Sequence, residues 1–282
     1  MDILWTVFGY LLCTRHDHTY GCKQFKVKLH NKERRDMSSK LRNLRHSLVL
    51  LGLLLALVAA APLQAGGDPQ GKGKYGNLTA QWWQWVYAQP TVDQDGTNTN
   101  PLLDSTGAYA AAGQEYGSGP AGKYFFLAGT VGANAERTVT VPADKGLFFP
   151  VINFEADNAV PANEDGSLVH KSVPELRAMA AEFVDATTSK YARLDGQDLE
   201  ILRVESPTFA YTLPAQDSLY AYYTAQGWCA CDEPQYQGTI KPVVSDGYWV
   251  YVPPLPRGKH TLEFGGSSTD FSIDIVYHLT VE

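Results

Sequence analysis

GYWVYVPPLPRGKHTLEFGGSSTDFSIDIVYHLTVE, residues 247–282, is the stretch that decides the fold class. Proline and glycine clusters at 253–258 and 265–270 predict two turns, which divide the stretch into three strands. From residue 271 to residue 281, apolar side chains alternate with polar ones, apart from Val276. This alternation is typical of a strand with one buried face, so the chain is expected to be rich in antiparallel β structure.

A register for the last two strands follows from pairing Phe264 with Phe271. That pairing places His260 on the apolar face and His278 on the polar face, because side chains alternate between the two faces of a strand. The two histidines are therefore not expected to share a metal ion.

The remaining segments predict further strands and two helices. Residues 78–90, LTAQWWQWVYAQP, predict a helix that is apolar on most sides and therefore buried, beginning near Thr79 and ending before Pro90. A second, amphipathic helix is expected after Ser172, which forms a capping-box pattern with Glu175. Because the chain has no βα repeat, we predict a mostly β fold, an antiparallel and jelly-roll-like β-sandwich that carries these two helices.

Three local patterns complete the expected fold. Residues 147–152 are apolar at every position, which predicts a strand covered on both faces. Asp195 and Gly196 form an Asp-Gly pair, which predicts a hairpin turn. Residues 218–238 are rich in tyrosine and are expected to form a long loop or an irregular hairpin.

Residues 37–65 have the layout of a secretory signal peptide. A basic segment precedes an apolar run at 48–61, and small residues then lead to an expected cleavage after Ala65. The competing interpretation is a membrane anchor, but spanning a bilayer takes about 20 apolar residues and this run is shorter. The sequence therefore predicts an exported protein, periplasmic or secreted.

The domain organisation follows from that leader. Residues 1–36 are expected to be an over-extended start or a disordered leader, because a signal peptide ordinarily begins the chain. Residues 66–75 predict a flexible lead-in, and residues 76–282 predict a single β-sandwich domain.

The charge of the exported part narrows the classes of partner. The chain has 23 Lys and Arg and 30 Asp and Glu, of which residues 1–65 hold 10 and 4, leaving 13 and 26 and a net charge of −13. An acidic chain without a basic cluster argues against nucleic acid as a partner. It suits neutral sugars, cations or basic partners, and no stable membrane span is expected in the mature chain.

Cys229 and Cys231 are the only cysteines after the leader, and a single alanine separates them. In an oxidising compartment we expect first a strained disulfide in a small ring. A soft metal held by the two thiolates, or two reduced thiols, are the alternatives.

Asp93 and Asp95 are calcium candidates, because the segment DQDGTNTN at 93–100 supplies hard oxygen ligands. The segment is not an EF-hand, since Gly96 stands at loop position 4, where the EF-hand has its glycine at position 6. A solvated acidic turn is the favoured interpretation, and no other cofactor is expected.

The sequence contains no motif that is specific for a catalytic mechanism. The chain has no Gly-x-Ser-x-Gly elbow. Four acids, Glu155, Asp157, Glu164 and Asp165, are among those that could pair for glycoside hydrolysis, but that mechanism depends on a separation in space. No catalytic residue is therefore assigned.

The aromatic residues give the ligand-binding candidates. Trp82 and Trp85 share a helical stripe with Leu78 and are expected in the core, whereas Trp83 lies on another stripe. Trp249 and Tyr251 share one face of a strand, and that face is either covered by the tryptophan helix or exposed as a platform. The predicted ligand-binding residues are Trp83, Trp249, Tyr251 and Trp228.

Three segments together resemble a family of exported bacterial proteins of uncharacterised function. They are LTAQWWQW (78–85) with NPLLD (100–104), VTVPADKGLFFPVIN (139–153), and DGYWVYVPPLPRGKHTLEFGG (246–266). The resemblance covers most of residues 76–282, while residues 1–36 and 93–100 depart from it. It implies an exported bacterial domain, and it carries no activity and no catalytic residue.

We therefore expect a non-catalytic binding protein for a glycan or a small apolar ligand. The alternatives are a secreted hydrolase of an envelope or extracellular polymer, and a structural or interaction protein. A binder needs an aromatic surface with few titratable groups, whereas a hydrolase needs convergent Asp, Glu or His.

Overall fold

The computed structural model of the chain describes residues 69–114, 121–159, 170–227, 238–268 and 271–282. The predicted leader, residues 1–65, lies outside these ranges, as do Glu164, Asp165, Trp228 and the two cysteines at 229 and 231.

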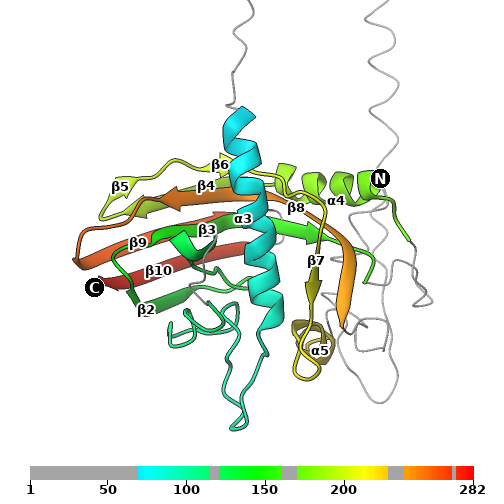
Figure 1. Cartoon of the computed structure of the whole chain (residues 1–282), viewed down its shortest axis with the longest axis horizontal. Helices are drawn as coiled ribbons and strands as arrows, with labels where there is room; N and C mark the ends of the chain where they lie inside the picture. Colours follow the sequence, from blue (N-terminus) through cyan, green and yellow to red (C-terminus); the bar gives the residue numbers. More distant parts are fainter. Residues whose placement is uncertain (1–68, 115–120, 160–169, 228–237, 269–270) are drawn as a thin grey trace, which may run out of the picture. The chain divides into compact units, whose positions relative to one another are not determined.

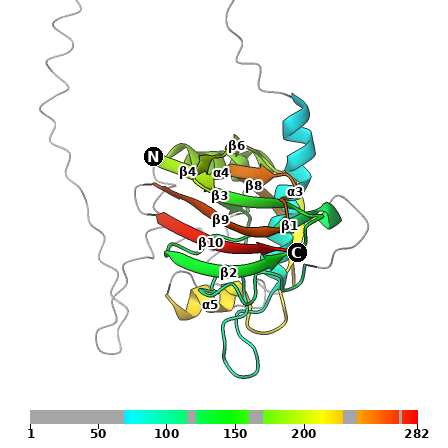
Figure 2. The ribbon, with the colours of Figure 1, turned by 90° about the vertical axis from the view of Figure 1, so that its left-hand side faces the viewer.

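The described chain is mostly β, with strands arranged in two sheets (Figures 1 and 2). The first sheet runs β1 (Tyr124–Phe126), β3 (Gly146–Ala156), β8 (Thr239–Val252) and β6 (Leu202–Arg203), and β7 (Phe209–Thr212) also pairs with β8. The second sheet runs β2 (Ala135–Val141), β10 (Ser272–Val281), β9 (Gly258–Ser267), β4 (Ser189–Leu194) and β5 (Gln197–Asp198).

Both sheets are mixed, which corrects the prediction of a purely antiparallel fold. β1 runs parallel to β3, and β2 runs parallel to β10. β2 and β3 follow one another along the chain but belong to different sheets. Alternation along a strand reports which face is buried and says nothing about the direction of the neighbouring strand, so the sequence pattern missed this.

The register predicted for the last hairpin is also wrong. Phe264 pairs with Ile275 rather than with Phe271, and His278 pairs with Thr261. The strands continue to Ser267, so the turn is tighter than the glycines suggested. The partner of Phe264 moves by four positions, from 271 to 275, and an even shift keeps every side chain on its predicted face.

The core between the two sheets comes from the alternating faces of their strands. In β10 the predicted alternation is confirmed, because residues 273, 275, 277, 279 and 281 are all buried. Phe149 of β3 contacts Phe264 of β9, with ring centroids 4.6 Å apart. β3 is buried on both faces as predicted, since Phe148 points the other way and packs in the core beneath the tryptophan helix.

Helix α3 (Pro69–Ala88) covers the outer face of the first sheet (Figure 1). It begins at Pro69, so the helix includes residues that the sequence assigned to a flexible lead-in. Trp82 and Trp85 are buried in the core as predicted. Their indole nitrogens donate to backbone carbonyls, Trp82 to Leu127 at 2.9 Å and Trp85 to Ala112 at 2.6 Å.

Asn100 fixes the C-terminal end of α3. Its Nδ2 donates to the carbonyls of Val86 and Gln89 at 2.8 and 3.0 Å, and its Oδ1 accepts from the backbone N–H of Leu102 at 3.0 Å. The last carbonyls of a helix have no partner within the helix, so a buried side-chain donor satisfies them. The NPLLD segment therefore has a structural role.

Helix α4 (Val173–Asp185) packs through Leu176, Ala180 and Val184 against β3 and β8. The predicted capping box is present, since the Glu175 carboxylate accepts from the Ser172 backbone N–H at 2.7 Å. The Asp195-Gly196 hairpin is confirmed between β4 and β5.

The tyrosine-rich residues 218–238 were expected to form a long loop or an irregular hairpin, and the structure corrects part of this expectation. Residues Leu219–Ala225 form a helix, α5, rather than a loop or a hairpin. Ser218 caps this helix by accepting from the backbone N–H of Ala221 at 3.1 Å.

Within the described ranges, no helix is both long enough and apolar enough to cross a bilayer.

Candidate functional site

Two acids, Glu155 and Asp157, lie where β3 ends. Residues two apart in a strand point to the same side, so the Glu-x-Asp spacing places both carboxyls on one side of the chain. Three tyrosines from elsewhere in the sequence meet them: Tyr87 in the last turn of α3, Tyr211 on β7 and Tyr220 on α5. α3 lies beside β7, and α5 follows β7 below them in Figure 1.

The Asp157 carboxylate accepts three hydrogen bonds. Its Oδ2 accepts from the hydroxyls of Tyr211 and Tyr220, the latter at 2.8 Å. Its Oδ1 accepts from the backbone N–H of Ala159 at 2.6 Å. The two tyrosine oxygens are themselves 2.6 Å apart. These donors favour the ionised form of Asp157.

Glu155 has far fewer partners. Its Oε1 accepts from the Tyr87 hydroxyl at 2.6 Å, while its Oε2 is buried and has no hydrogen-bond partner among the described residues. Burial, the neighbouring charge of Asp157 and a hydrogen bond between the two carboxyls raise the pKa of Glu155 well above its ordinary value. Burial also raises the pKa of Asp157, but the hydrogen bonds from Tyr211 and Ala159 oppose that shift. Glu155 is therefore the member that holds a proton first, and Asp157 carries the charge.

The rings around the two carboxyls form a stack. Trp83 lies against Tyr87 with centroids 5.7 Å apart, and Tyr87 lies against Tyr211 at 4.1 Å with an interplanar angle of 10°. Tyr220 meets Tyr87 edge-on at 5.7 Å. We call Glu155, Asp157, Trp83, Tyr87, Tyr211, Tyr220 and Tyr223 the acid–aromatic cluster.

Trp83 brings a second unsatisfied atom to the acid–aromatic cluster. The side chain is only 8% exposed, and its Nε1 has no hydrogen-bond partner in the described part of the chain. Trp83 stacks on Tyr87, and the Tyr87 hydroxyl donates a hydrogen bond to Glu155. A free indole donor and a free carboxyl oxygen therefore flank the same tyrosine, and a ligand that both accepts and donates hydrogen bonds would satisfy both.

The tyrosines of the cluster are neutral donors at ordinary pH. Burial, followed by the charges of the two acids, raises the pKa values of Tyr87, Tyr211 and Tyr220 well above that of free tyrosine. Burial likewise raises the pKa of Tyr223, with a further contribution from Glu155. The cluster therefore has a negative charge and no titrating hydroxyl near neutrality.

The pH dependence of protein stability should reveal the raised pKa of Glu155. A raised carboxyl pKa means that the folded state holds its proton more tightly than the unfolded state, whose pKa is about 4.3. Stability is then lost as pH rises from about 4.3 through the raised value. The free energy of unfolding of the parent should therefore fall between pH 5 and pH 8, and that of the Glu155→Gln variant should fall less. Urea unfolding of both proteins at the two pH values measures the difference.

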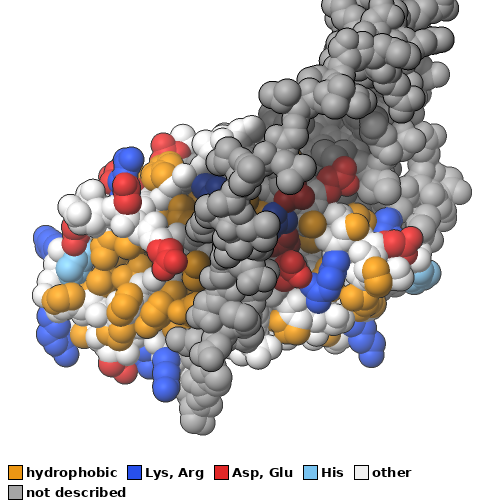
Figure 3. Space-filling view, turned by 90° about the horizontal axis from the view of Figure 1, so that it is seen from above, with side chains coloured by type: hydrophobic (Ala, Val, Ile, Leu, Met, Phe, Trp, Pro, Cys, Tyr) orange, Lys and Arg blue, Asp and Glu red, His pale blue; other side chains and the backbone are white. Residues whose placement is uncertain are grey.

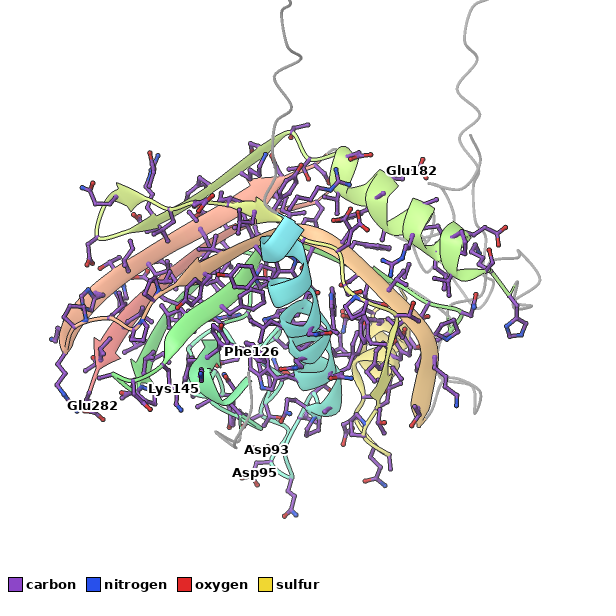
Figure 4. The ribbon with its side chains drawn as sticks, turned by 45° about the horizontal axis from the view of Figure 1, so that its top comes forward. Asp93, Asp95, Phe126, Lys145, Glu182 and Glu282 are labelled. Atoms are coloured by element: carbon purple, nitrogen blue, oxygen red, sulfur yellow. The ribbon has the colours of Figure 1, made fainter. Side chains whose placement is uncertain are left out.

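Glu182→Gln is the matched control for this pH dependence, because Glu182 is exposed on α4 (Figure 4). The groups that face Glu155 are Asp157, Tyr87, Tyr211, Tyr220 and Tyr223. None of the tyrosines titrates below pH 8, so they add no pH dependence in this range. A difference between the Glu155→Gln variant and the parent that is equal at pH 5 and pH 8 would contradict the raised pKa.

The other predicted ligand-binding residues lie elsewhere. Trp249 is 1% exposed and packs between Trp82 and Phe148, at centroid distances of 5.5 and 5.0 Å. Tyr251 is half-buried beside Tyr75 of α3 at 5.8 Å. Of the two alternatives for that strand face, the structure therefore shows the covered one. Figure 3 shows apolar side chains gathered on the surface at the left-hand end of the molecule.

No family model, curated protein or solved structure matches this chain. The resemblance to exported bacterial proteins therefore stays a prediction. So do the predictions on the leader, on Trp228 and on the cysteine pair, which lie outside the described residues.

The two calcium candidates, Asp93 and Asp95, lie at the exposed tip of a loop (Figure 4). The Asp93 Oδ1 accepts from the backbone N–H groups of Asp95 and Thr97, both at 2.9 Å, so this carboxylate closes the loop on itself. Within the ranges that the structure describes, no group of three or more His, Cys, Asp or Glu is placed to hold a metal ion.

The histidines of the last hairpin have separate acidic partners. His260 Nδ1 lies 2.7 Å from Asp195 Oδ2, and His278 Nε2 lies 2.7 Å from Glu136 Oε1. The hydrogen bond to Asp195 raises the pKa of His260. Neither histidine contacts the acid–aromatic cluster through these bonds.

The sequence named Glu155 and Asp157 as two of many acids and missed their tyrosine partners. The useful signal was the Glu-x-Asp spacing at the end of an apolar strand, which predicts that both point to one side. Nothing in the sequence indicated that Tyr87, Tyr211 and Tyr220 converge there. Their convergence depends on the packing of α3 and α5 around β7.

Proposed function

We propose that the chain is an exported binding protein that recognises a glycan at the acid–aromatic cluster. The signal-peptide layout of residues 37–65 supports export. Aromatic rings next to a few well-placed polar groups are typical of small-molecule sites. A sugar ring offers hydroxyls for the polar groups and apolar C–H faces for the rings.

One observation carries the proposal: two buried polar atoms on either side of Tyr87, Glu155 Oε2 and Trp83 Nε1, have no partner in the described chain. Leaving a buried donor or acceptor unpaired costs about 1–3 kcal/mol, so native structures contain few such atoms. A sugar hydroxyl both donates and accepts hydrogen bonds. It can therefore accept from the indole and donate to the carboxyl, which an apolar ligand cannot do.

The test replaces the indole and keeps an aromatic ring. Trp83→Phe removes the Nε1 donor, so the affinity for a soluble oligosaccharide that binds the parent should fall about tenfold, the loss expected for one hydrogen bond of about 1.4 kcal/mol. Isothermal titration calorimetry measures the affinity, after thermal shift has found the binding oligosaccharide in a panel.

Trp249→Phe is the matched control. It removes another buried indole N–H without a described partner, but Trp249 lies in the core beneath Trp82 and outside the cluster. The control should bind the oligosaccharide like the parent. If the two variants lose affinity equally, or if no oligosaccharide in the panel raises the melting temperature of the parent, the proposed site is wrong.

A second candidate, a hydrolase, is favoured by one feature of the same acids. Their environments separate the proton holder Glu155 from the charged Asp157, and such separation assigns a general acid and a base or nucleophile in many glycosidases. A hydrolase would release reducing ends from a bound oligosaccharide, and Glu155→Gln would stop that release while binding persists. Binding of intact oligosaccharide without any release supports the non-catalytic proposal.

A further inference from the structure

We infer that the glycan bound at the acid–aromatic cluster carries an amino group, so that an ammonium ion of the ligand contacts Glu155 and Asp157. This inference rests on the proposed function and adds the chemical class of the ligand. It comes from the charge of the two acids, which form no ion pair with a cation among the described residues.

Three other acids among the described residues show the contrast. Asp246, whose side chain is 3% exposed, receives the Arg203 guanidinium at 2.6 Å. Asp195 pairs with His260 at 2.7 Å. Asp104 has no cation among the residues that the structure describes, but its carboxylate accepts from the backbone N–H groups of Thr106 and Tyr109 at 2.8 and 2.9 Å, and from further donors. Each of these acids is either neutralised or fully hydrogen-bonded.

The pair at 155 and 157 is different. Among the ion pairs of the described residues, none involves Glu155 or Asp157. The internal segments outside the described ranges, 115–120, 160–169, 228–237 and 269–270, contain no lysine, arginine or histidine in the sequence.

Two neighbouring carboxyls without a cation repel one another when both are ionised. Without a ligand, a proton on Glu155 relieves that repulsion. A ligand ammonium does the same and also brings hydrogen-bond donors to Glu155 Oε2, which has no partner among the described residues. The proton on Glu155 then leaves to solvent, so binding exchanges one positive charge for another.

The aromatic part of the cluster suits the same ligand. The face of a tyrosine ring attracts cations, and the Tyr223 side chain lies near Glu155. The hydroxyls of Tyr87, Tyr211 and Tyr220 already donate to the carboxylates, so they hold the negative charge in place. The indole N–H of Trp83 needs an acceptor, which a hydroxyl of the same sugar provides and an isolated ammonium ion does not.

The experiment compares three oligosaccharides with the same β-1,4 backbone and length. They are built from glucosamine, N-acetylglucosamine and glucose, and differ only in carrying ammonium, acetamide or hydroxyl at one position of each ring. Isothermal titration calorimetry with the exported protein at pH 6 and low salt should give a Kd for the glucosamine oligomer at least about tenfold lower than for the other two.

Asp157→Asn tests the origin of that preference, with Glu182→Gln as control because it removes the same charge from an exposed site on α4. Asp157→Asn should reduce the preference to about threefold or less, and the control should keep it. If the Asn variant does not fold, the parent protein still decides. Titrations of the glucosamine oligomer in two buffers of different ionisation enthalpy should then show release of protons on binding.

Each outcome decides the inference. Equal affinity for the three oligomers overturns it and leaves the proposed function standing, whereas no binding of any oligomer removes both. A preference that Asp157→Asn and Glu182→Gln lower equally also overturns it, because it then reflects general attraction to an acidic surface. Proton uptake or no proton change in the two buffers contradicts the exchange at Glu155.

Discussion

Trp82→Ala is expected to lower the free energy of unfolding by about 3–5 kcal/mol, a large share of the roughly 5–15 kcal/mol that stabilises a domain. Trp82 is 1% exposed and packs edge-on against both Trp83 and Trp249, with centroids 5.0 and 5.5 Å away. Its indole nitrogen also donates to the Leu127 carbonyl at 2.9 Å. Alanine leaves a cavity under α3 and an unpaired carbonyl.

Urea unfolding followed by circular dichroism measures this loss. Asn77→Ala is the control on the same helix, because Asn77 is exposed and its replacement by alanine should change stability by no more than about 0.5 kcal/mol. A Trp82→Ala variant that unfolds at the same urea concentration as the parent would falsify the assignment of this tryptophan to the core. The aromatic run would then have to be an exposed surface.

Arg203→Ala should destabilise the fold by about 3–5 kcal/mol through the buried charge that it leaves behind. The Arg203 guanidinium donates to both oxygens of Asp246: Nε donates to Oδ1 at 3.3 Å and to Oδ2 at 3.0 Å, and Nη2 donates to Oδ2 at 2.6 Å. Its Nη1 donates to Asp185 Oδ1 at 2.5 Å. These bonds join β6, β8 and α4. Without the arginine, Asp246 remains buried with no cation among the described residues.

Arg193→Ala is the matched control for Arg203. Arg193 makes a comparable contact with Asp198 at 3.0 Å, but the two side chains are 51% and 84% exposed. Exposed ion pairs contribute about 0–1 kcal/mol, so this variant should unfold close to the parent. Equal losses in both variants would mean that burial of Asp246 does not set the effect. Asp246→Asn combined with Arg203→Ala should recover part of the stability.

Trp83 and Trp249 are both buried, and comparing them connects stability with the proposed function. Both indoles are buried without a described partner for their N–H groups, yet only Trp83 lies in the acid–aromatic cluster. Comparing Trp83→Phe with Trp249→Phe therefore shows whether an unpaired indole N–H only lowers stability, as expected in the core, or also contributes to ligand binding. Such a donor at a binding site is a cost that the bound ligand removes.

The sequence by itself determined the features that depend on neighbouring residues. Alternation from residue 271 to residue 281 reports a strand with one buried face, and the Asp195-Gly196 pair reports a hairpin turn, because side-chain direction and backbone φ are local properties. The dense apolar surface of residues 78–90 reported a buried helix, and Trp82 and Trp85 are in the core.

Only the tertiary structure decided which elements are neighbours. The parallel pairs β1–β3 and β2–β10, the register of β9 with β10 and the helix α5 all depend on contacts between residues far apart in the sequence. The acid–aromatic cluster has the same origin. Tyr87, Glu155 and Tyr220 come from three separate elements, and burial by those elements raises the pKa of Glu155. Local patterns specify the buried face of an element, whereas the partner on that face is chosen by the packing of the whole chain.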